Sequence, residues 1–221
     1  MPLELQICQE HDLPSFVRIQ LSAFSAGGGM TTLLKPDPLP ADWGEKALQR
    51  HLTSLREERD VVFLKVIDTE LRDDDGQSQM IAGAKWRVNT KERSEEQVRA
   101  TLPRPGKDDE GRPAAVEFYR FLARVRWEYM GTKPFYFLHI LVTDPVHHRR
   151  GAGAMLIRWG TQQADEARLP CFLESTVVGK PLYLRHGFEP QYEEHWDLTK
   201  YGLQGADCTT VMIRPAASHV H

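Results

Sequence analysis

Hydrophobic and polar residues alternate along several short stretches of the chain, a pattern typical of β-strands with one buried face. The clearest stretch runs from Tyr136 to Thr143 and stops at Asp144 and Pro145, because proline cannot donate to a strand ladder. Further strands are predicted at 3–7, 60–67, 80–88, 171–176, 191–198 and 209–214. The stretches 60–67 and 80–88 form a long hairpin around an acidic loop.

Apolar residues at helical spacing fill most of the intervals between these strands. They predict helices at about 12–24, 42–56, 113–130 and 151–168. The segment 89–112 is charged and only weakly periodic, so it is interpreted as an insertion with a short helix near 95–102. Strands that alternate with helices predict a single mixed α/β domain over residues 1–215. The tail 216–221 is expected to be disordered.

Composition narrows the class of protein without naming a function. The chain has 221 residues, of which 41% are hydrophobic and 27% charged, enough for one substantial core. A formal net charge of -3 gives no reason to expect nucleic acid as a partner, and no apolar run is long enough to cross a membrane. The first residues lack a signal-peptide pattern, and three cysteines have no metal-like spacing. We therefore expect a cytoplasmic protein without a metal site.

The loop after the central strand has the chemistry of an anion site. It reads His-His-Arg-Arg-Gly-Ala-Gly over 147–153 and leads directly into a predicted helix. The first N–H groups of a helix lack intrahelical partners and lie at the positive end of its dipole. Gly151 and Gly153 would let a diphosphate approach the main chain, and Arg149 and Arg150 add positive charge. The plain alternative is a solvated, arginine-rich turn.

Two common phosphate motifs do not fit this loop. A dinucleotide-binding fingerprint needs a third glycine where this chain has Leu156, and the Gly-Lys-Ser/Thr of a P-loop is absent. The loop instead resembles the acetyl-CoA-binding motif of the GNAT N-acetyltransferase superfamily, Gln/Arg-x-x-Gly-x-Gly/Ala after a strand. The segment 181–188, Pro-Leu-Tyr-Leu-Arg-His-Gly-Phe, is similar to that superfamily's Leu-Tyr-x-x-x-Gly-Phe signature. The overall spacing also resembles that of fungal members.

This resemblance implies a mostly antiparallel, centrally splayed sheet flanked by helices, with acetyl-CoA as cosubstrate. It implies that the pantetheine arm lies along the central strand, where the Leu141 N–H would polarise the thioester carbonyl. Tyr183 would be the general acid that protonates the departing thiolate. His148 stands where the superfamily has Gln or Arg. The cofactor-binding residues implied in this way are Leu141, Val142, Thr143, His148, Arg149, Arg150, Gly151, Ala152, Gly153 and Ala154.

The general base and the acceptor site are less clearly marked. By strict alternation, Phe137, His139, Leu141 and Thr143 share one face, which makes His139 the candidate base. The position of this histidine also resembles that in serotonin N-acetyltransferases. A histidine satisfied within the sheet is the alternative, with solvent accepting the proton. The glycine-rich loop at 27–30 is expected to border the acceptor site.

Three residues are candidates for contact with the acceptor: Met30, Trp86 and Glu174. For Trp86 the alternative is a core residue, and for Glu174 a structural carboxylate. The expected reaction is direct attack by the primary amine of a small molecule on acetyl-CoA in a ternary complex. A protein or peptide acceptor and a non-catalytic acyl-CoA-binding module remain alternatives. We expect a monomer or a homodimer.

Overall fold

A computed structural model describes residues 2–26 and 28–217 of the chain. Seven strands form one sheet in the order β1-β2-β3-β4-β5-β7-β6, and every neighbouring pair is antiparallel except β4 and β5. All seven predicted strands are confirmed, with the hairpin strands longer than expected. The strands are β1 (Leu3–Ile7), β2 (Val61–Arg72), β3 (Ser78–Asn89), β4 (Phe135–Thr143), β5 (Cys171–Thr176), β6 (Glu189–Asp197) and β7 (Ala206–Arg214).

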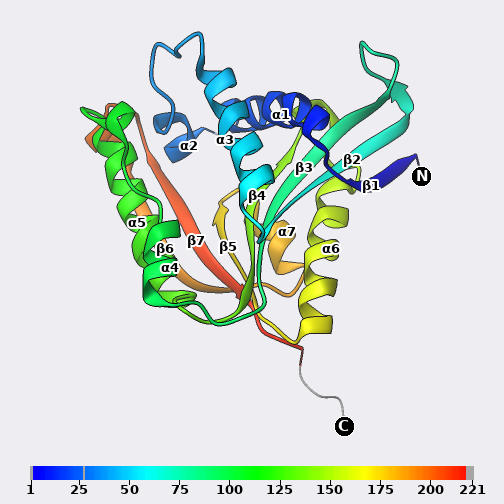
Figure 1. Ribbon diagram of the computed structural model, residues 1–221. Helices are drawn as coiled ribbons and strands as arrows, with labels where there is room; N and C mark the ends of the chain where they lie inside the picture. The colour runs from blue at the N-terminus through cyan, green and yellow to red at the C-terminus, as the bar shows by residue number, and fades with distance from the viewer. Residues whose placement is uncertain (1, 27, 218–221) are drawn as a thin grey trace.

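Helices cover both faces of this sheet (Figure 1). The predicted long helices and the short helix in the insertion are confirmed, and α2 forms within the segment expected to be a loop. The helices are α1 (Leu13–Ala26), α2 (Gly29–Leu33), α3 (Trp43–Glu57), α4 (Glu95–Thr101), α5 (Pro113–Tyr129), α6 (Ala152–Ala167) and α7 (Lys180–Leu184). Gly27 and the tail 218–221 lie outside the described residues. No helix in the described part of the chain has the length and apolarity needed to cross a membrane.

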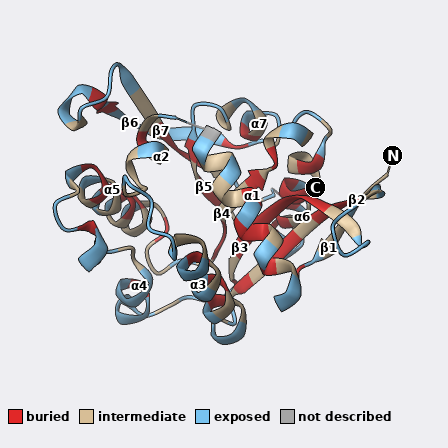
Figure 2. Cartoon of the chain, turned by 90° about the horizontal axis from the view of Figure 1, so that it is seen from above, coloured by how far each residue is buried: buried red, intermediate tan, exposed pale blue. Residues whose placement is uncertain are grey.

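Three apolar clusters hold the helices on the sheet. The first lies between α6, α7 and the central strands, and it contains Trp86 and Leu156. The second lies between α5 and the strands β5 and β7, and the third between α1, α3 and the hairpin. Figure 2 shows buried residues along the strands and exposed ones on the outer sides of the helices. The helix α5, which follows the insertion, therefore adds to the cover of one sheet face rather than forming a separate core.

The sheet opens at its centre, as the resemblance implied. Strands β4 and β5 pair only at Tyr136 with Cys171 and at Phe137 with Phe172. Beyond these pairs, the edge of β4 from 138 to 143 faces no strand of the described chain on that side. A sheet edge exposes unpaired N–H and C=O groups that an extended ligand can use.

A β-bulge in β4 changes which side chains share a face. Leu138 pairs with Trp86 and Ile140 with Lys85, so His139 is an extra residue without a partner in β3. Such an insertion shifts the alternation by one position. Leu138 and Leu141 both pack on the α6 side, whereas Ile140 and Val142 pack on the α1 side. His139 stacks on Phe137, with ring centroids 5.1 Å apart. The prediction that Phe137, His139, Leu141 and Thr143 share one face is therefore wrong.

Candidate active site

One cavity of about 250 Å³ collects residues from both sequence motifs. The end of β4 contributes Leu141, Val142 and Thr143, the following loop contributes His148, and α7 contributes Tyr183. The remaining walls come from α1, α2, the loop between β5 and α7, and β7. These remaining lining residues are Ala23, Phe24, Gly28, Thr31, Thr176, Val177, Val178, Gly179 and Asp207. Segments far apart in the sequence thus meet where the central strands separate.

The backbone of β4 presents hydrogen-bonding groups to this opening. The Asp144 N–H donates to the Ile81 carbonyl of β3 at 2.9 Å. Because successive residues of a strand point their polar groups to opposite sides, the groups of Leu141 and Thr143 face the open edge. Consistent with this direction, the His148 Nε2 lies 3.2 Å from the Thr143 carbonyl oxygen. The edge can therefore pair with an extended ligand at Leu141 and Thr143.

The N-terminus of α6 is uncapped and could hold an anion. Gly151 is the N-cap residue, no side chain caps the helix, and its first turn has no acidic residue. The first backbone bond runs from the Met155 N–H to the Gly151 carbonyl at 3.2 Å. The amides of Ala152, Gly153 and Ala154 therefore have no intrahelical acceptor. A Cβ built on Gly151 meets nothing within 4 Å, so there is open space beside these amides.

The two motif glycines are needed for different reasons. Gly151 has φ +92°, a left-handed conformation that other residues adopt only with strain. A Cβ on Gly153 would lie 3.2 Å from the Leu182 Cδ2, so this glycine lets α6 pack close to α7. The space, the free amides and the positive helix end together fit a diphosphate.

The two arginines of the loop, Arg149 and Arg150, have different surroundings. The Arg150 guanidinium pairs with the buried Asp68 carboxylate of β2 and also lies 3.2 Å from the His147 Nδ1. This ion pair anchors the loop, so binding of a diphosphate by Arg150 would compete with Asp68. Arg149 is exposed, has φ +61° and forms no ion pair among the described residues. Of the two predicted cations, only Arg149 has no carboxylate partner among the described residues.

Tyr183 has the properties of a proton donor. It lies on α7, and its ring packs at an angle of 65° against Phe188 with centroids 6.0 Å apart. Burial raises the pKa of the Tyr183 phenol above its ordinary value. The hydroxyl therefore keeps its proton at neutral pH. The backbone N–H of Phe188 donates to the Tyr183 carbonyl at 3.2 Å, which fixes the short helix.

His139 lies outside this cavity. It borders a separate cavity of about 50 Å³, together with Arg87, Arg93 and Arg126. No lining residue is common to the two cavities. Burial first, and then Arg126 and other nearby cations, lower the pKa of His139 well below its ordinary value. The proposed base role rested on a face shared with Leu141, and that premise does not hold.

None of the three predicted acceptor contacts lines the active-site cavity. The Met30 side chain is buried in the α5 cluster, although its backbone N–H donates to Asp207 at 2.8 Å. Trp86 is fully buried and its Nε1–H donates to the Leu156 carbonyl at 3.3 Å. Glu174 accepts two bonds from Arg126, at 2.7 and 3.2 Å, as a buried structural carboxylate. The core alternative for Trp86 and the structural alternative for Glu174 are the ones that the structure supports.

Several residues that line the cavity were not predicted from the sequence, among them Phe24, Thr31 and Asp207. Asp207 accepts the N–H groups of Met30 and Cys208, both at 2.8 Å, and so ties α2 to β7. A Cβ on Gly29 would lie 2.2 Å from the Asp207 Oδ2, so the glycine is needed for this contact. No local pattern marks Asp207, because its place depends on how β7 pairs within the sheet.

Known structures share this fold from end to end. An arylalkylamine N-acetyltransferase 2 from Aedes aegypti matches with a TM-score of 0.66 at 11% identity, over 97% of this chain and 99% of the other. An acetyltransferase from Corynebacterium glutamicum, described as histone acetyltransferase HPA2 and related, matches with a TM-score of 0.60 at 17% identity, over 100% of both chains. The PaiA N-acetyltransferase of Thermoplasma acidophilum, solved with coenzyme A, has a TM-score of 0.53 at 13% identity, over 97% and 99%.

Comparison of sequences alone finds no relative of this chain. No protein-family model matches the chain, and no curated protein matches it in sequence. What these solved structures share with it is the fold, which in this chain is an open, seven-stranded mixed sheet flanked by helices. The chain therefore has the fold of the GNAT acetyltransferases.

Proposed function

We propose that this protein transfers the acetyl group of acetyl-CoA to the primary amine of a small molecule by direct attack in a ternary complex. The observation that carries the proposal is the shared cavity: Tyr183, protonated at neutral pH, lines the same space as the open edge of β4. The uncapped N-terminus of α6 follows directly from that strand. A proton donor, an extended backbone edge and an anion site are the parts that this transfer requires.

Each part has a separate task. The amides at 152–154 and the charge of Arg149 hold the diphosphate of acetyl-CoA, and the open groups of Leu141 and Thr143 pair with its pantetheine arm. Acetyl-CoA supplies an acetyl group activated as a thioester. The Leu141 N–H donates to the carbonyl oxygen on which negative charge develops as the amine attacks. Tyr183 donates its proton to the sulfur that leaves, and solvent accepts the proton of the amine.

The cavity favours a small acceptor. Its volume of about 250 Å³ is below that of typical drug-sized pockets. Apolar walls from Phe24, Val142 and Val177 suit a hydrocarbon body, and Asp207 is the one carboxylate among its lining residues. A carboxylate attracts the ammonium form in which an amine arrives from water. These features support a cationic small amine over a peptide, which needs an extended groove.

Tyr183→Phe tests the mechanism. It removes the phenol without removing the ring, so kcat should fall by about 100-fold or more while the Kd for acetyl-CoA stays within about twofold. Thiol release measures kcat, and calorimetry measures the Kd. The matched control is Tyr201→Phe, because Tyr201 bonds to Glu117 away from the cavity and should not affect turnover. Unchanged turnover in Tyr183→Phe would remove this residue as the acid.

A panel of acceptors separates the proposal from its alternatives. Turnover with small amines supports it, whereas turnover only with peptides favours a protein N-acetyltransferase. Tight binding of acetyl-CoA without turnover on any amine favours a non-catalytic acyl-CoA-binding module. The catalytic domain at 1–215, a cytoplasmic setting, a monomeric or homodimeric state and a fungal type of sequence remain parts of the proposal. The three cysteines are unpaired, as a reducing compartment would keep them.

A further inference from the structure

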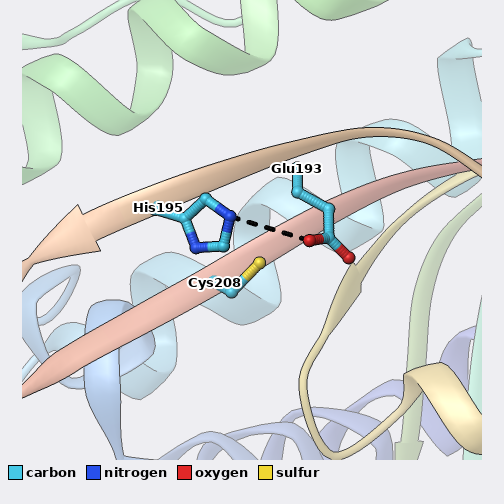
Figure 3. A group of neighbouring side chains, drawn as sticks. All are labelled: Glu193, His195 and Cys208. Carbon is cyan, nitrogen blue, oxygen red and sulfur yellow. Dashed lines mark ion pairs between the residues drawn. The ribbon is translucent and has the colours of Figure 1, made fainter.

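Three potential metal ligands meet on the outer strands of the sheet. Glu193 and His195 lie two residues apart on β6, so their side chains share one face, and His195 stands opposite Cys208 in the register with β7. Figure 3 shows the three side chains gathered over the two strands. One ligand atom from each residue lies within 4.8 Å of the other two. Sequence spacing gave no hint of this group, because the ladder between β6 and β7 creates it.

The atoms offered suit zinc better than harder cations. They are an imidazole nitrogen, a thiol sulfur and a carboxylate oxygen, the three ligand types that zinc takes in proteins. Calcium and magnesium prefer oxygen alone. Zinc bonds of about 2.0–2.3 Å place tetrahedral ligands about 3.3–3.8 Å apart, so the group needs to contract by about 1 Å. The His195 Nε2 and the Glu193 Oε2 are already 3.6 Å apart.

The side chains of Glu193 and His195 can move closer together. The side chain of His195 is 72% exposed and that of Glu193 is 38% exposed, so both can change rotamer without disturbing a core. The strands beneath them pair continuously from 193 to 197, so the backbone positions are fixed. We propose that Glu193, His195 and Cys208 bind a zinc ion through three protein ligands, with a fourth position open to water.

Lys180 is a built-in competitor for this site. Its Nζ pairs with the Oε1 of Glu193 from the first turn of α7. A divalent cation must share this carboxylate with the ammonium group and is repelled by it. Removal of the Lys180 charge should therefore tighten zinc binding, an effect that a purely structural ion pair does not produce.

Cobalt(II) is the probe for the sulfur ligand, because a cobalt–thiolate bond gives a near-ultraviolet charge-transfer absorption. The full-length reduced protein should show this band on titration, and Cys208→Ser should lose it. Cys171→Ser is the matched control, since Cys171 is buried in the core and should not affect the band. No band in the wild-type protein, or a band that survives Cys208→Ser, would overturn the proposal.

Calorimetry with zinc tests the other two ligands. His195→Ala and Glu193→Gln should each weaken the affinity by more than about tenfold, since even second-shell partners cost 10–100-fold. His11→Ala is the histidine control and should leave the affinity unchanged, because the exposed His11 lies near Asp12 rather than near this group. Lys180→Met should bind zinc at least about threefold more tightly. Equal zinc affinity in the wild-type, His195→Ala and Glu193→Gln proteins would refute the three-ligand site.

Discussion

The indole ring of Trp86 lies directly against the backbone of Gly160 in α6. A Cβ built on Gly160 would lie 2.2 Å from the Trp86 Cζ2, and the ring is fully buried. The glycine is thus required by packing, in the interior of a helix where it otherwise costs stability. A tryptophan held in this way serves the core, which is why it is not available to an acceptor.

Gly160→Ala should destabilise the protein by about 1–3 kcal/mol, because the added methyl group overpacks the core against Trp86. The matched control is Gly44→Ala in α3, where the nearest side-chain atom to the new Cβ is 3.8 Å away. That substitution should not destabilise the protein, because the new methyl group makes only an ordinary van der Waals contact. Urea unfolding of both variants measures the two free energies. Equal effects of the same sign would contradict this account of the packing.

At the scale of elements, α1 and α3 are joined by a buried polar contact. The His51 Nε2 of α3 lies 2.7 Å from the Gln20 Oε1 of α1, and the imidazole packs edge-on against Phe16 and Phe63. Burial, followed by the charges of Lys85 and Arg50, lowers the pKa of His51 to about 4. The helix pair therefore holds a neutral histidine that the unfolded chain would protonate.

This contact predicts a loss of stability in mild acid. Above pH 6.5 His51 is neutral in both states, and below it the unfolded state binds the extra proton. Stability should therefore fall as the pH drops from 6.5 towards about 4, by up to about 3 kcal/mol from this residue. His139 should also lower the stability as the pH falls, because its pKa in the folded protein is lowered too. Urea unfolding at several pH values measures the slope.

His51→Gln is the comparison for this slope, since glutamine can still donate towards Gln20 but does not titrate. The variant should lose distinctly less stability than the wild-type protein over the same pH interval. Carboxylates contribute equally to both proteins, so the difference between the two slopes isolates the histidine. Parallel slopes would show that His51 does not control the acid response.

At the scale of the whole molecule, the sheet consists of two halves that meet at only two residue pairs of β4 and β5. The half from β1 to β4 carries the loop to α6, and the half from β5 to β6 carries α7 with Tyr183. Under the proposed function, acetyl-CoA lies between them and contacts both. Its binding should therefore stabilise the fold, by about 2.7 kcal/mol at a ligand concentration of 100 times Kd.

Amide hydrogen exchange should locate that ligand. In the free protein the amides of Leu141 and Thr143 face the open edge and should exchange rapidly, whereas the Val142 amide faces β3 and should be protected. Saturating coenzyme A should slow exchange at Leu141 and Thr143 and leave the amide of Val66 in the outer hairpin unchanged. Protection of Leu141 in the free protein, or no change there on binding, would contradict the proposed pairing along β4.

The local pattern of apolar and polar residues predicted most helices and strands of this protein, because most of them are amphipathic. The strand alternation and helical spacing located all seven strands, the long helices and the short helix of the insertion. Gly151, Gly153 and Tyr183 could be marked from sequence because their motifs are contiguous, and the structure brings the strand end and Tyr183 to one cavity. Helices, strands and contiguous motifs each depend on a few residues that are close together in the sequence.

Tertiary structure decided whatever depends on pairing between distant segments. One extra residue opposite β3 moved His139 off the face of Leu141, which no alternation within β4 could reveal. The helix α6 made Trp86 a core residue, Arg126 bound Glu174, and the β6–β7 ladder gathered Glu193, His195 and Cys208. The sequence by itself thus determined the elements and the contiguous motifs, since short-range periodicity and turn chemistry set them. Only the fold decided which faces, partners and cavities they share, because these depend on register and packing across the sheet.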